Sequence, residues 1–470
     1  MSTFTTNIQL VYVLAAACFV VGLHLMNSPA TARRGNQVST AGMAIAIIVT
    51  VILLIHEGTV TGVGWTVLIV GSLLGSAAGL YSARTVQMTA MPQLVSMFNA
   101  VGGGAAALVA IYEYIHDESL PGGVLGTTSV FTVLDVIIGS VTFTGSLIAA
   151  GKLQGVITGS PVVFRGGRAL NVALAVIALG TGAFMFTTAS LPALLILVLA
   201  SLAFGVMMVL PIGGADMPVV ISLLNAFTGT AVAMAGFVVG NWALIIAGAL
   251  VGASGGILTK LMADAMNRSL ANIIIGGFGT GDTAVAAAVS GDAQVRSIAA
   301  DDAAIQLAYA SKVIIVPGYG LAAAQAQHAV AELATLLESR GIEVSYAIHP
   351  VAGRMPGHMN VLLAEANVPY PLLREMEEIN PEFPRADVAL VIGANDVTNP
   401  AARRAGTAIS GMPILDVDQA KSIIVIKRSM GSGYAGIDNE LYVNPKTSMY
   451  FADAKKALGE MTAAVKTLVA

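Results

Sequence analysis

Nine long apolar runs in the first 262 residues limit the possible folds of this chain more than any other feature. They lie near residues 8–26, 40–56, 60–82, 93–115, 129–150, 169–187, 191–210, 218–239 and 242–261. A helix that crosses a bilayer needs about 20 mostly apolar residues, and its backbone polar groups must bond within the segment. We therefore predict a polytopic α-helical membrane domain of about nine spans over residues 1–262.

Charged residues are scarce and are concentrated in the C-terminal part of the chain. They make up 11% of the 470 residues, whereas an average soluble protein has about 25%. Only eight of the 23 Lys and Arg residues and seven of the 27 Asp and Glu residues lie before residue 271. This distribution predicts a membrane part followed by a water-soluble part. The net charge of −4 gives no reason to expect nucleic acid, and the single cysteine, Cys18, excludes an internal disulfide.

The basic residues of the membrane part predict its orientation, because cytoplasmic loops accumulate Lys and Arg. With the N-terminus outside, all of them fall on the inner side: Arg33, Arg34, Arg84, Lys152, Arg165, Arg168, Lys260 and Arg268. An odd number of spans then places residues 271–470 in the cytoplasm.

Polar residues inside apolar spans must be paired, hydrated or functional. Asn99, Asp135 and Asn225 lie within the expected spans, and Asp216 lies at the inner edge before the eighth span. Each is a candidate for a polar pathway. An interhelical hydrogen bond would also explain the asparagines, and capping of the eighth helix would also explain Asp216.

The C-terminal part is typical of an α/β domain. Residues 263–310 are rich in Gly, Ala and Asp and are predicted to form a linker to a domain over residues 311–470. Strands and helices alternate in that domain, which indicates a Rossmann-like parallel sheet. We expect strands at residues 312–317, 343–349, 387–393, 413–417 and 422–427, one helix from Gly318 to about Arg340, and a last helix over residues 448–468.

A G-x-G-x-x-A motif at Gly318, Gly320 and Ala323 follows the first expected strand and opens a helix. These glycines permit a tight turn and close approach of a pyrophosphate, whose charge a helix N-terminus favours. Tyr319 could stack on the ligand or simply cover the sheet. The motif therefore predicts a dinucleotide site.

The choice of dinucleotide follows from the next strands. An NAD site has an acidic residue at the end of the second strand, but residues 349–354 contain none and end in Arg354. Lys427, Arg428 and Ser429 follow a later strand and suit a 2′-phosphate. NADP is therefore favoured, although a solvated strand end would also explain the two cations. Residues 393–396 close another strand at the same edge, either as a simple turn or with Asp396 facing the nucleotide.

Eight segments carry a resemblance to a known family. They are GGADMPVV at 213–220, AMNRS at 265–269, GGFGT at 276–280, PGYG at 317–320, HPVAGRMPGHMNVLLAEA at 349–366, GAND at 393–396, KRSM at 427–430 and GYAG at 433–436. Over essentially its whole length the chain resembles the β subunit of proton-translocating NAD(P) transhydrogenase. In that family, hydride passes directly between two nicotinamides, and inward proton flow drives formation of NADPH.

The resemblance implies an oxidoreductase and translocase of the bacterial inner membrane that is active only with an α subunit. That partner carries the NAD(H) domain and further membrane helices, and the assembled protomers form a dimer. The implied NADP(H) site comprises Gly318, Tyr319, Gly320, Val351, Ala352, Gly353, Arg354, Met355, Pro356, Gly393, Ala394, Asn395, Asp396, Val397, Lys427, Arg428, Ser429, Met430, Gly433, Tyr434, Ala435, Asp453 and Ala454. Asp216, Asn225 and Arg268 fall on positions tied to coupling between the membrane and the cofactor.

One departure from the family concerns the proton path. Some members have a histidine, their favoured proton carrier, where this chain has Asn99, and asparagine cannot titrate. The carrier would then lie elsewhere, for example on a membrane helix of the α subunit, with Asn99 holding water in the path. A function of another class is a transporter or channel gated by a nucleotide-sensing C-terminal domain, and hydride transfer with an NAD-site partner distinguishes the two.

Overall fold

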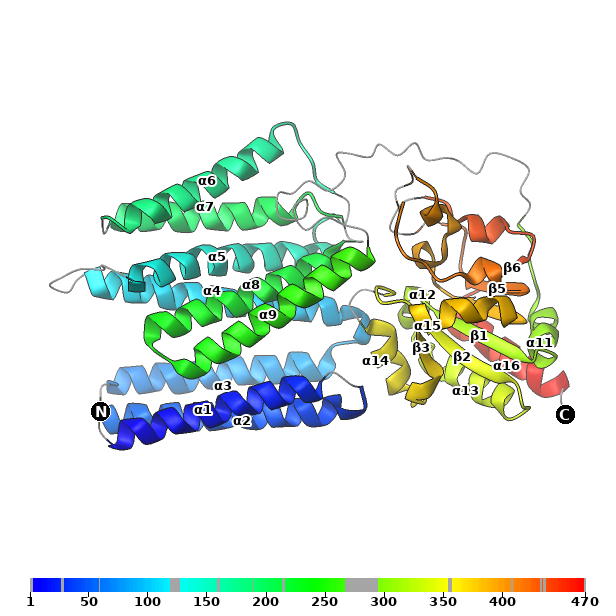
Figure 1. Cartoon of the computed structure of the whole chain (residues 1–470), viewed down its shortest axis with the longest axis horizontal. Helices are drawn as coiled ribbons and strands as arrows, with labels where there is room; N and C mark the ends of the chain where they lie inside the picture. The colour runs from blue at the N-terminus through cyan, green and yellow to red at the C-terminus, as the bar shows by residue number, and fades with distance from the viewer. Residues whose placement is uncertain are drawn as a thin grey trace. The chain divides into compact units, whose positions relative to one another are not determined.

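In the computed structural model the chain forms two compact units, a helical unit and a C-terminal α/β unit (Figure 1). It describes residues 3–26, 29–58, 60–118, 127–158, 161–188, 190–213, 216–266, 295–353, 357–405, 407, 409–431, 433 and 437–468.

The described part of the helical unit contains nine helices that are long and apolar enough to cross a membrane. They are α1 (Thr3–Leu25), α2 (Pro29–Glu57), α3 (Gly62–Thr85), α4 (Met91–Glu118), α5 (Thr127–Gln154), α6 (Gly167–Met185), α7 (Leu191–Val209), α8 (Met217–Val239) and α9 (Trp242–Ala265). Each of the nine predicted runs coincides with one helix, so the prediction of a polytopic helical domain is confirmed.

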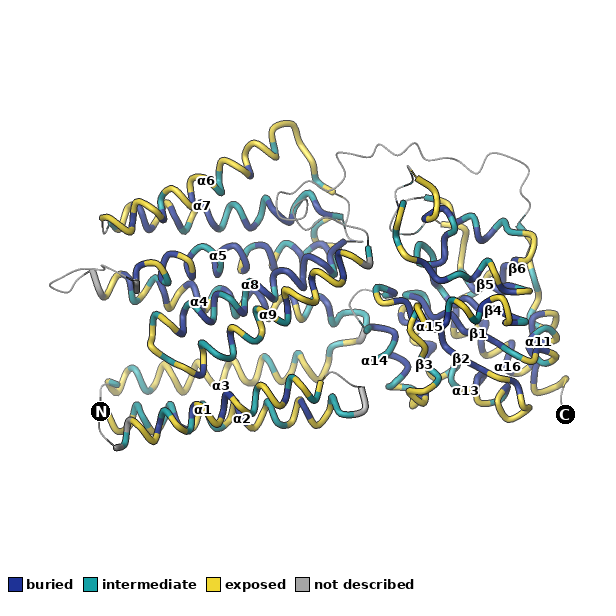
Figure 2. The backbone as a smooth tube through the Cα atoms, in the orientation of Figure 1, coloured by how far each residue is buried: buried dark blue, intermediate teal, exposed yellow. Residues whose placement is uncertain are grey.

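Small residues let several of these helices approach closely. A Cβ at Gly139 of α5 would overlap the Gly103 carbonyl of α4, and a Cβ at Gly229 of α8 would overlap the backbone of Gly252 in α9. Larger residues would force these helices apart, so the glycines serve helix packing. Figure 2 shows that α5 and α8 are the more deeply buried helices, whereas α3 has no buried residue.

The C-terminal unit is built on a six-stranded sheet in the order β3-β2-β1-β4-β5-β6. Its strands are β1 (Lys312–Pro317), β2 (Glu343–Ile348), β3 (Leu373–Glu375), β4 (Val388–Ile392), β5 (Ser422–Lys427) and β6 (Thr447–Phe451). All five neighbouring pairs are parallel. This strand order is that of the Rossmann fold, and it confirms the predicted fold class.

Both faces of the sheet are covered, as a parallel sheet requires. Alternate residues such as Ile314, Val391 and Val425 pack with Phe383 and Leu415 in one core cluster. The opposite face is covered by helices α13 (Gln327–Glu338), which contacts β2, and α16 (Ala454–Leu468), which contacts β5. Figure 2 shows the strands as the buried centre of this unit.

Three expected elements differ from the structure. The strand expected at residues 413–417 is wrong, because the segment is irregular. Pro413 has no N–H to donate, and Leu415 N and Asp416 N bond instead to the Val397 carbonyl and the Asn380 side chain. The single helix expected from Gly318 to Arg340 is two helices, α12 (Tyr319–Ala323) and α13, separated at Gln325, whose φ is 52°.

The third difference is at the C-terminus, where the helix expected over residues 448–468 begins later. Residues Thr447–Phe451 form β6, and α16 starts at Ala454 after Asp453, whose carboxylate accepts from Lys455 N at 3.1 Å. The short strand β3 was not expected either. Within the range expected as a linker, α11 (Ala300–Ala308) packs on α16, and Ile298 N donates to the Met449 carbonyl.

Candidate functional site

A cavity of about 270 Å³ lies at the carboxyl ends of β1, β4 and β5. Its lining residues are Tyr319, Gly320, Ala323, Ala324, Gly393, Ile426, Lys427, Arg428, Ser429, Ala452, Asp453 and Ala454. The strand order reverses between β1 and β4, and open α/β sheets bind their ligands in the crevice at such a point. The structure thus brings together predicted residues from three turns and from the start of α16.

Glycines let the turns after β1 and β4 come into direct backbone contact. Gly318 N donates to the Ile392 carbonyl at 2.9 Å, and Gly320 N donates to the Gly393 carbonyl at 3.0 Å. A Cβ at Gly318 would overlap Ala394, and a Cβ at Gly320 would overlap Gly393. The glycines are therefore required by the packing of the turns. Because α12 has only five residues, its end contributes less to anion binding than a long helix would.

Lys427 is a cation of the cavity whose side chain is held by contacts with Gly431 and Tyr442. Its Nζ donates to the Gly431 carbonyl and lies 4.7 Å from the centre of the Tyr442 ring. Burial lowers the pKa of Lys427 below its ordinary value, while the nearby Asp396 and Asp438 act in the opposite direction. Arg428 and Ser429 follow it on the exposed side of the turn. An anion in this cavity would meet two cations and a hydroxyl.

The turn after β4 is held by a second layer of polar contacts. Asn439 Nδ2 donates to the Asn395 carbonyl at 2.9 Å, and the Tyr442 hydroxyl donates to the Ala394 carbonyl at 3.0 Å. The Asp396 carboxylate lies against Gly433, because a Cβ there would overlap it. The turn predicted from residues 393–396 therefore places Asp396 beside the segment that follows Lys427.

His349, directly after β2, stands where a ribose-binding acid would be in an NAD site. It is 1% exposed. Its Nδ1 accepts from Val351 N at 3.2 Å, so its Nε2 carries the proton and donates to the Pro413 carbonyl at 2.8 Å. The neutral ring thus links the end of β2 to the irregular segment at Pro413.

Lowering the pH below about 6.5 should destabilise the C-terminal unit through His349. Burial lowers the pKa of His349 to about 4, whereas an unfolded histidine has a pKa of about 6.5. The unfolded state binds the proton more tightly, so we expect the free energy of unfolding to fall by about 3 kcal/mol between these two pH values. Denaturant unfolding of residues 296–470 at several pH values measures this loss. His349→Gln should show a smaller slope, and an equal slope would contradict the assignment.

The other predicted site residues are distributed as follows. Val351, Ala352 and Gly353 follow β2 but do not line the cavity, and a Cβ at Gly353 would overlap the His358 ring. Asn395 and Val397 belong to the turn after β4, and Met430 follows Ser429. Arg268, Arg354, Met355, Pro356, Tyr434 and Ala435 lie outside the described residues.

In the helical unit, Asn99 joins two helices. Its Nδ2 donates to the Ile221 carbonyl of α8 at 3.4 Å, and its own carbonyl accepts from Thr228 Oγ1 at 3.3 Å. This is the interhelical hydrogen bonding that the sequence left open. Asn225 is half-buried on α8, and Asp216, 7% exposed, directly precedes that helix.

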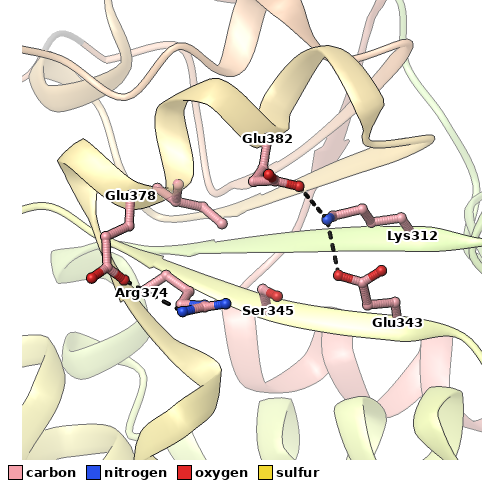
Figure 3. Close-up of a pocket in the computed structure, with 7 residues that line it drawn as sticks. Lys312, Glu343, Ser345, Arg374, Glu378 and Glu382 are labelled. Carbon is pink, nitrogen blue, oxygen red and sulfur yellow. Dashed lines mark hydrogen bonds and ion pairs between the residues drawn. The ribbon is translucent and has the colours of Figure 1, made fainter.

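A second cavity, of about 260 Å³, lies at the opposite end of the same sheet (Figure 3). There Lys312, the first residue of β1, is 2.9 Å from Glu343 and 2.6 Å from Glu382, and Arg374 pairs with Glu378 at 3.5 Å. The cations of this cavity are already neutralised by glutamates. It is also at the amino ends of the strands, so it is the weaker candidate for a nucleotide site.

Several residues of the site were not expected from the sequence. Ala324, Ile426 and Ala452 line the cavity, and Asn439 and Tyr442 support it. The apolar ones carry no chemical signal. The supporting pair lies more than 40 residues after the turn that it holds, so only the folded chain brings them together.

Comparison with known proteins extends over both units. A family model for the NAD(P) transhydrogenase beta subunit matches residues 8–464. The NAD(P) transhydrogenase subunit beta of Rhodospirillum rubrum is 49% identical to this chain over 460 residues, which cover 97% of this chain and 98% of the relative. The protein of the same name from a specified strain of that species matches with the same identity and coverage.

Proposed function

Because the chain belongs to the family of NAD(P) transhydrogenase beta subunits, we propose that it is the NADP(H)-binding, proton-conducting subunit of its enzyme. The enzyme would couple hydride transfer between NAD(H) and NADP(H) to inward proton translocation and so generate NADPH. The observation that carries the proposal is the cavity at the switch point of the sheet, with Lys427 and Arg428 at its edge.

The residues of this cavity fit a phosphorylated dinucleotide. Lys427, Arg428 and Ser429 line the cavity and offer charge-assisted hydrogen bonds to a 2′-phosphate. The neutral His349 at the end of β2 offers no carboxylate to a ribose. Bound NADP(H) would supply the nicotinamide that accepts or donates hydride. The protein would orient it, and Tyr319, which lines the cavity, would contact it.

The NAD(H) site is proposed to lie on a separate α subunit, in keeping with the name beta subunit. The chain has one dinucleotide motif that follows a strand, at Gly318. A nucleotide-gated transporter would also need this site, but the family match favours the transhydrogenase. We further propose a dimer of assembled protomers in the bacterial inner membrane, with residues 1–262 in lipid, 263–310 as a connection and 311–470 in the cytoplasm.

Reconstitution in sealed vesicles tests this function. The chain, together with an NAD-binding α subunit, should reduce NADP⁺ with NADH and should change the internal pH in step with the reaction. An ionophore that dissipates the proton gradient should change the rate of NADPH formation. Hydride transfer without any proton movement, or proton movement without hydride transfer, would contradict the proposal.

Coupling between proton and cofactor is proposed to involve Asp216 and Asp396. A carboxylate near a bound phosphate makes proton and cofactor binding mutually dependent, since like charges repel. In the wild type we expect protonation to change the NADP(H) affinity by a coupling factor of roughly 5 to 150, and we expect Asp396→Asn to remove most of this factor. Asp216→Asn should impair coupled turnover while NADP⁺ still binds. Calorimetry at several pH values and the vesicle assay measure these effects.

The exposed Asp301 on α11 provides the matched control, and Asp301→Asn should behave as wild type. If Asp216 and Asp396 only cap helices, asparagine would replace them at little cost. Wild-type pumping and wild-type pH profiles in both variants would therefore remove these residues from the mechanism.

A further inference from the structure

Asp135, one of the candidates for a polar pathway in the sequence, is a buried carboxylate to which the proposed function gives no specific role. It lies on α5 and is 0% exposed, and neither carboxylate oxygen has a hydrogen-bond partner among the described residues. By contrast, the buried Lys152 of the same helix donates to the Leu210 and Ile212 carbonyls at 2.5 and 2.8 Å. An ionisable group inside a membrane is costly to keep, and a group without a structural partner indicates a function.

Few charges can reach Asp135. Lys152 is 17 residues further along α5, roughly 25 Å away along the helix axis. Of the helices linked to α5, α7 and α8 contain no ionisable residue, and α6 contains Arg168 near its start. The described ionisable side chains of α4 are the exposed Tyr112 and His116, the half-buried Glu113, and Tyr114, whose hydroxyl accepts from Ser190 N. Gly182 of α6 lies against Val133, so Arg168, which is 14 residues earlier, is roughly 20 Å away along the helix axis. No described lysine or arginine of these helices is therefore close enough to hold Asp135 as a permanent anion.

Asp135 belongs to a line of small and polar residues on one face of α5. Residues spaced by three and four share one helix face, and this face carries Asp135, Gly139, Thr142 and Ser146. Gly139 and Thr142 lie against Gly103 of α4, and the Ser146 carbonyl accepts from Ser96 Oγ of α4 at 2.8 Å. The face is therefore directed at α4.

Asn99 lies on α4 one turn beyond Gly103, so it is about 12 Å from Asp135 along the axis of the helix pair. From Asn99 the polar groups continue along α8 and α9. Thr228 Oγ1 donates to the Asn99 carbonyl, and Thr259 Oγ1 is 3.1 Å from Ser222 Oγ. Asp135 is the one titratable side chain among these polar groups.

We propose that Asp135 is the group that takes up and releases the proton in this subunit, with Asn99 as a fixed polar partner further along the path. This inference rests on the proposed function and deepens it. The carboxylate takes a proton from a hydronium ion, becomes a neutral acid and leaves a water molecule. It then gives the proton to a water molecule on the side of Asn99 and is a carboxylate again. Only O–H bonds form and break.

Two measurements on the full chain test this role. In vesicles with the NAD-binding subunit, Asp135→Asn should reduce proton transport by about 100-fold, and Asp135→Glu, which restores a titratable group, should recover most of it. The control Glu57→Gln changes an exposed carboxylate at the end of α2 and should pump as wild type. Infrared spectroscopy of the chain alone should show the carbonyl band of a protonated acid that disappears in Asp135→Asn.

The two readouts separate the possible failures. Wild-type transport by Asp135→Asn would overturn the proposal and would place the carrier elsewhere, for example on the partner subunit. Absence of the infrared band from the wild type at every pH tested would also overturn it. Loss of NADP(H) binding by Asp135→Asn would indicate that this variant is misfolded. The infrared band of the wild type and proton transport by Asp135→Glu would then test whether Asp135 carries the proton. If wild-type vesicles fail to pump, the proposed function fails, and the band still decides whether Asp135 titrates.

Discussion

The purified chain by itself is expected to transfer no hydride from NADH to NADP⁺, and addition of an NAD-binding α subunit is expected to start the reaction. Direct transfer requires two nicotinamides held in contact, and fixing two reactants in this way is worth effective concentrations of about 10⁵ to 10⁸ M. The chain has one dinucleotide motif after a strand, at Gly318, and one cavity at the switch point of its described sheet. Spectrophotometry with both nucleotides present measures the rate.

Two controls make this result decisive. NADP⁺ binding by the chain alone, measured by calorimetry, shows that its own site is intact when turnover is absent. The α subunit alone, with both nucleotides, should be equally inactive. Steady turnover by the purified chain without the α subunit would refute the division of the two nucleotide sites between two subunits.

Lys427→Ala should weaken NADP(H) binding by roughly 10- to 150-fold, since a charge-assisted hydrogen bond to a phosphate is worth about 1.5 to 3 kcal/mol. The lysine lines the cavity, where burial and the Tyr442 ring hold it in place. Burial lowers the pKa of Lys427. A bound phosphate would act in the opposite direction, because an opposite charge stabilises the protonated lysine. Calorimetry with NADP⁺ on the full chain in detergent measures the change.

A lysine outside the cavity provides the matched comparison. Lys456 lies on α16, 70% exposed, in a 3.8 Å ion pair with Glu460. Lys456→Ala removes the same charge from the same unit and should leave NADP⁺ affinity within about twofold, since an exposed ion pair is worth little. Unchanged NADP⁺ affinity in Lys427→Ala would remove this lysine from the site and would favour a solvated strand end.

The membrane spans were predictable because their signal is local. A helix in lipid satisfies its backbone hydrogen bonds within its own segment, so each apolar run can be identified by itself. All nine runs are helices in the structure. The Rossmann-like class was predictable for a related reason, since β1, β4 and β5 are short apolar runs followed by turns. The strands β3 and β6 lie at the two edges of the sheet. The strand β3 consists of Leu373, Arg374 and Glu375, and β6 begins with Thr447 and Ser448, so no continuous apolar run marked either of them.

The sequence by itself determined the two-part organisation, the parallel α/β class and most of the residues that line the cavity, because apolar length, strand–turn–helix order and glycine–cation motifs are properties of neighbouring residues. Only the tertiary structure decided that Gly318 and Gly320 serve the contact between two turns, and that burial keeps His349 neutral while its Nε2 donates to the Pro413 carbonyl. It also decided that Asp135 is buried away from any described hydrogen-bond partner. These features depend on contacts between segments far apart in the chain, which form only when the sheet and the helices pack.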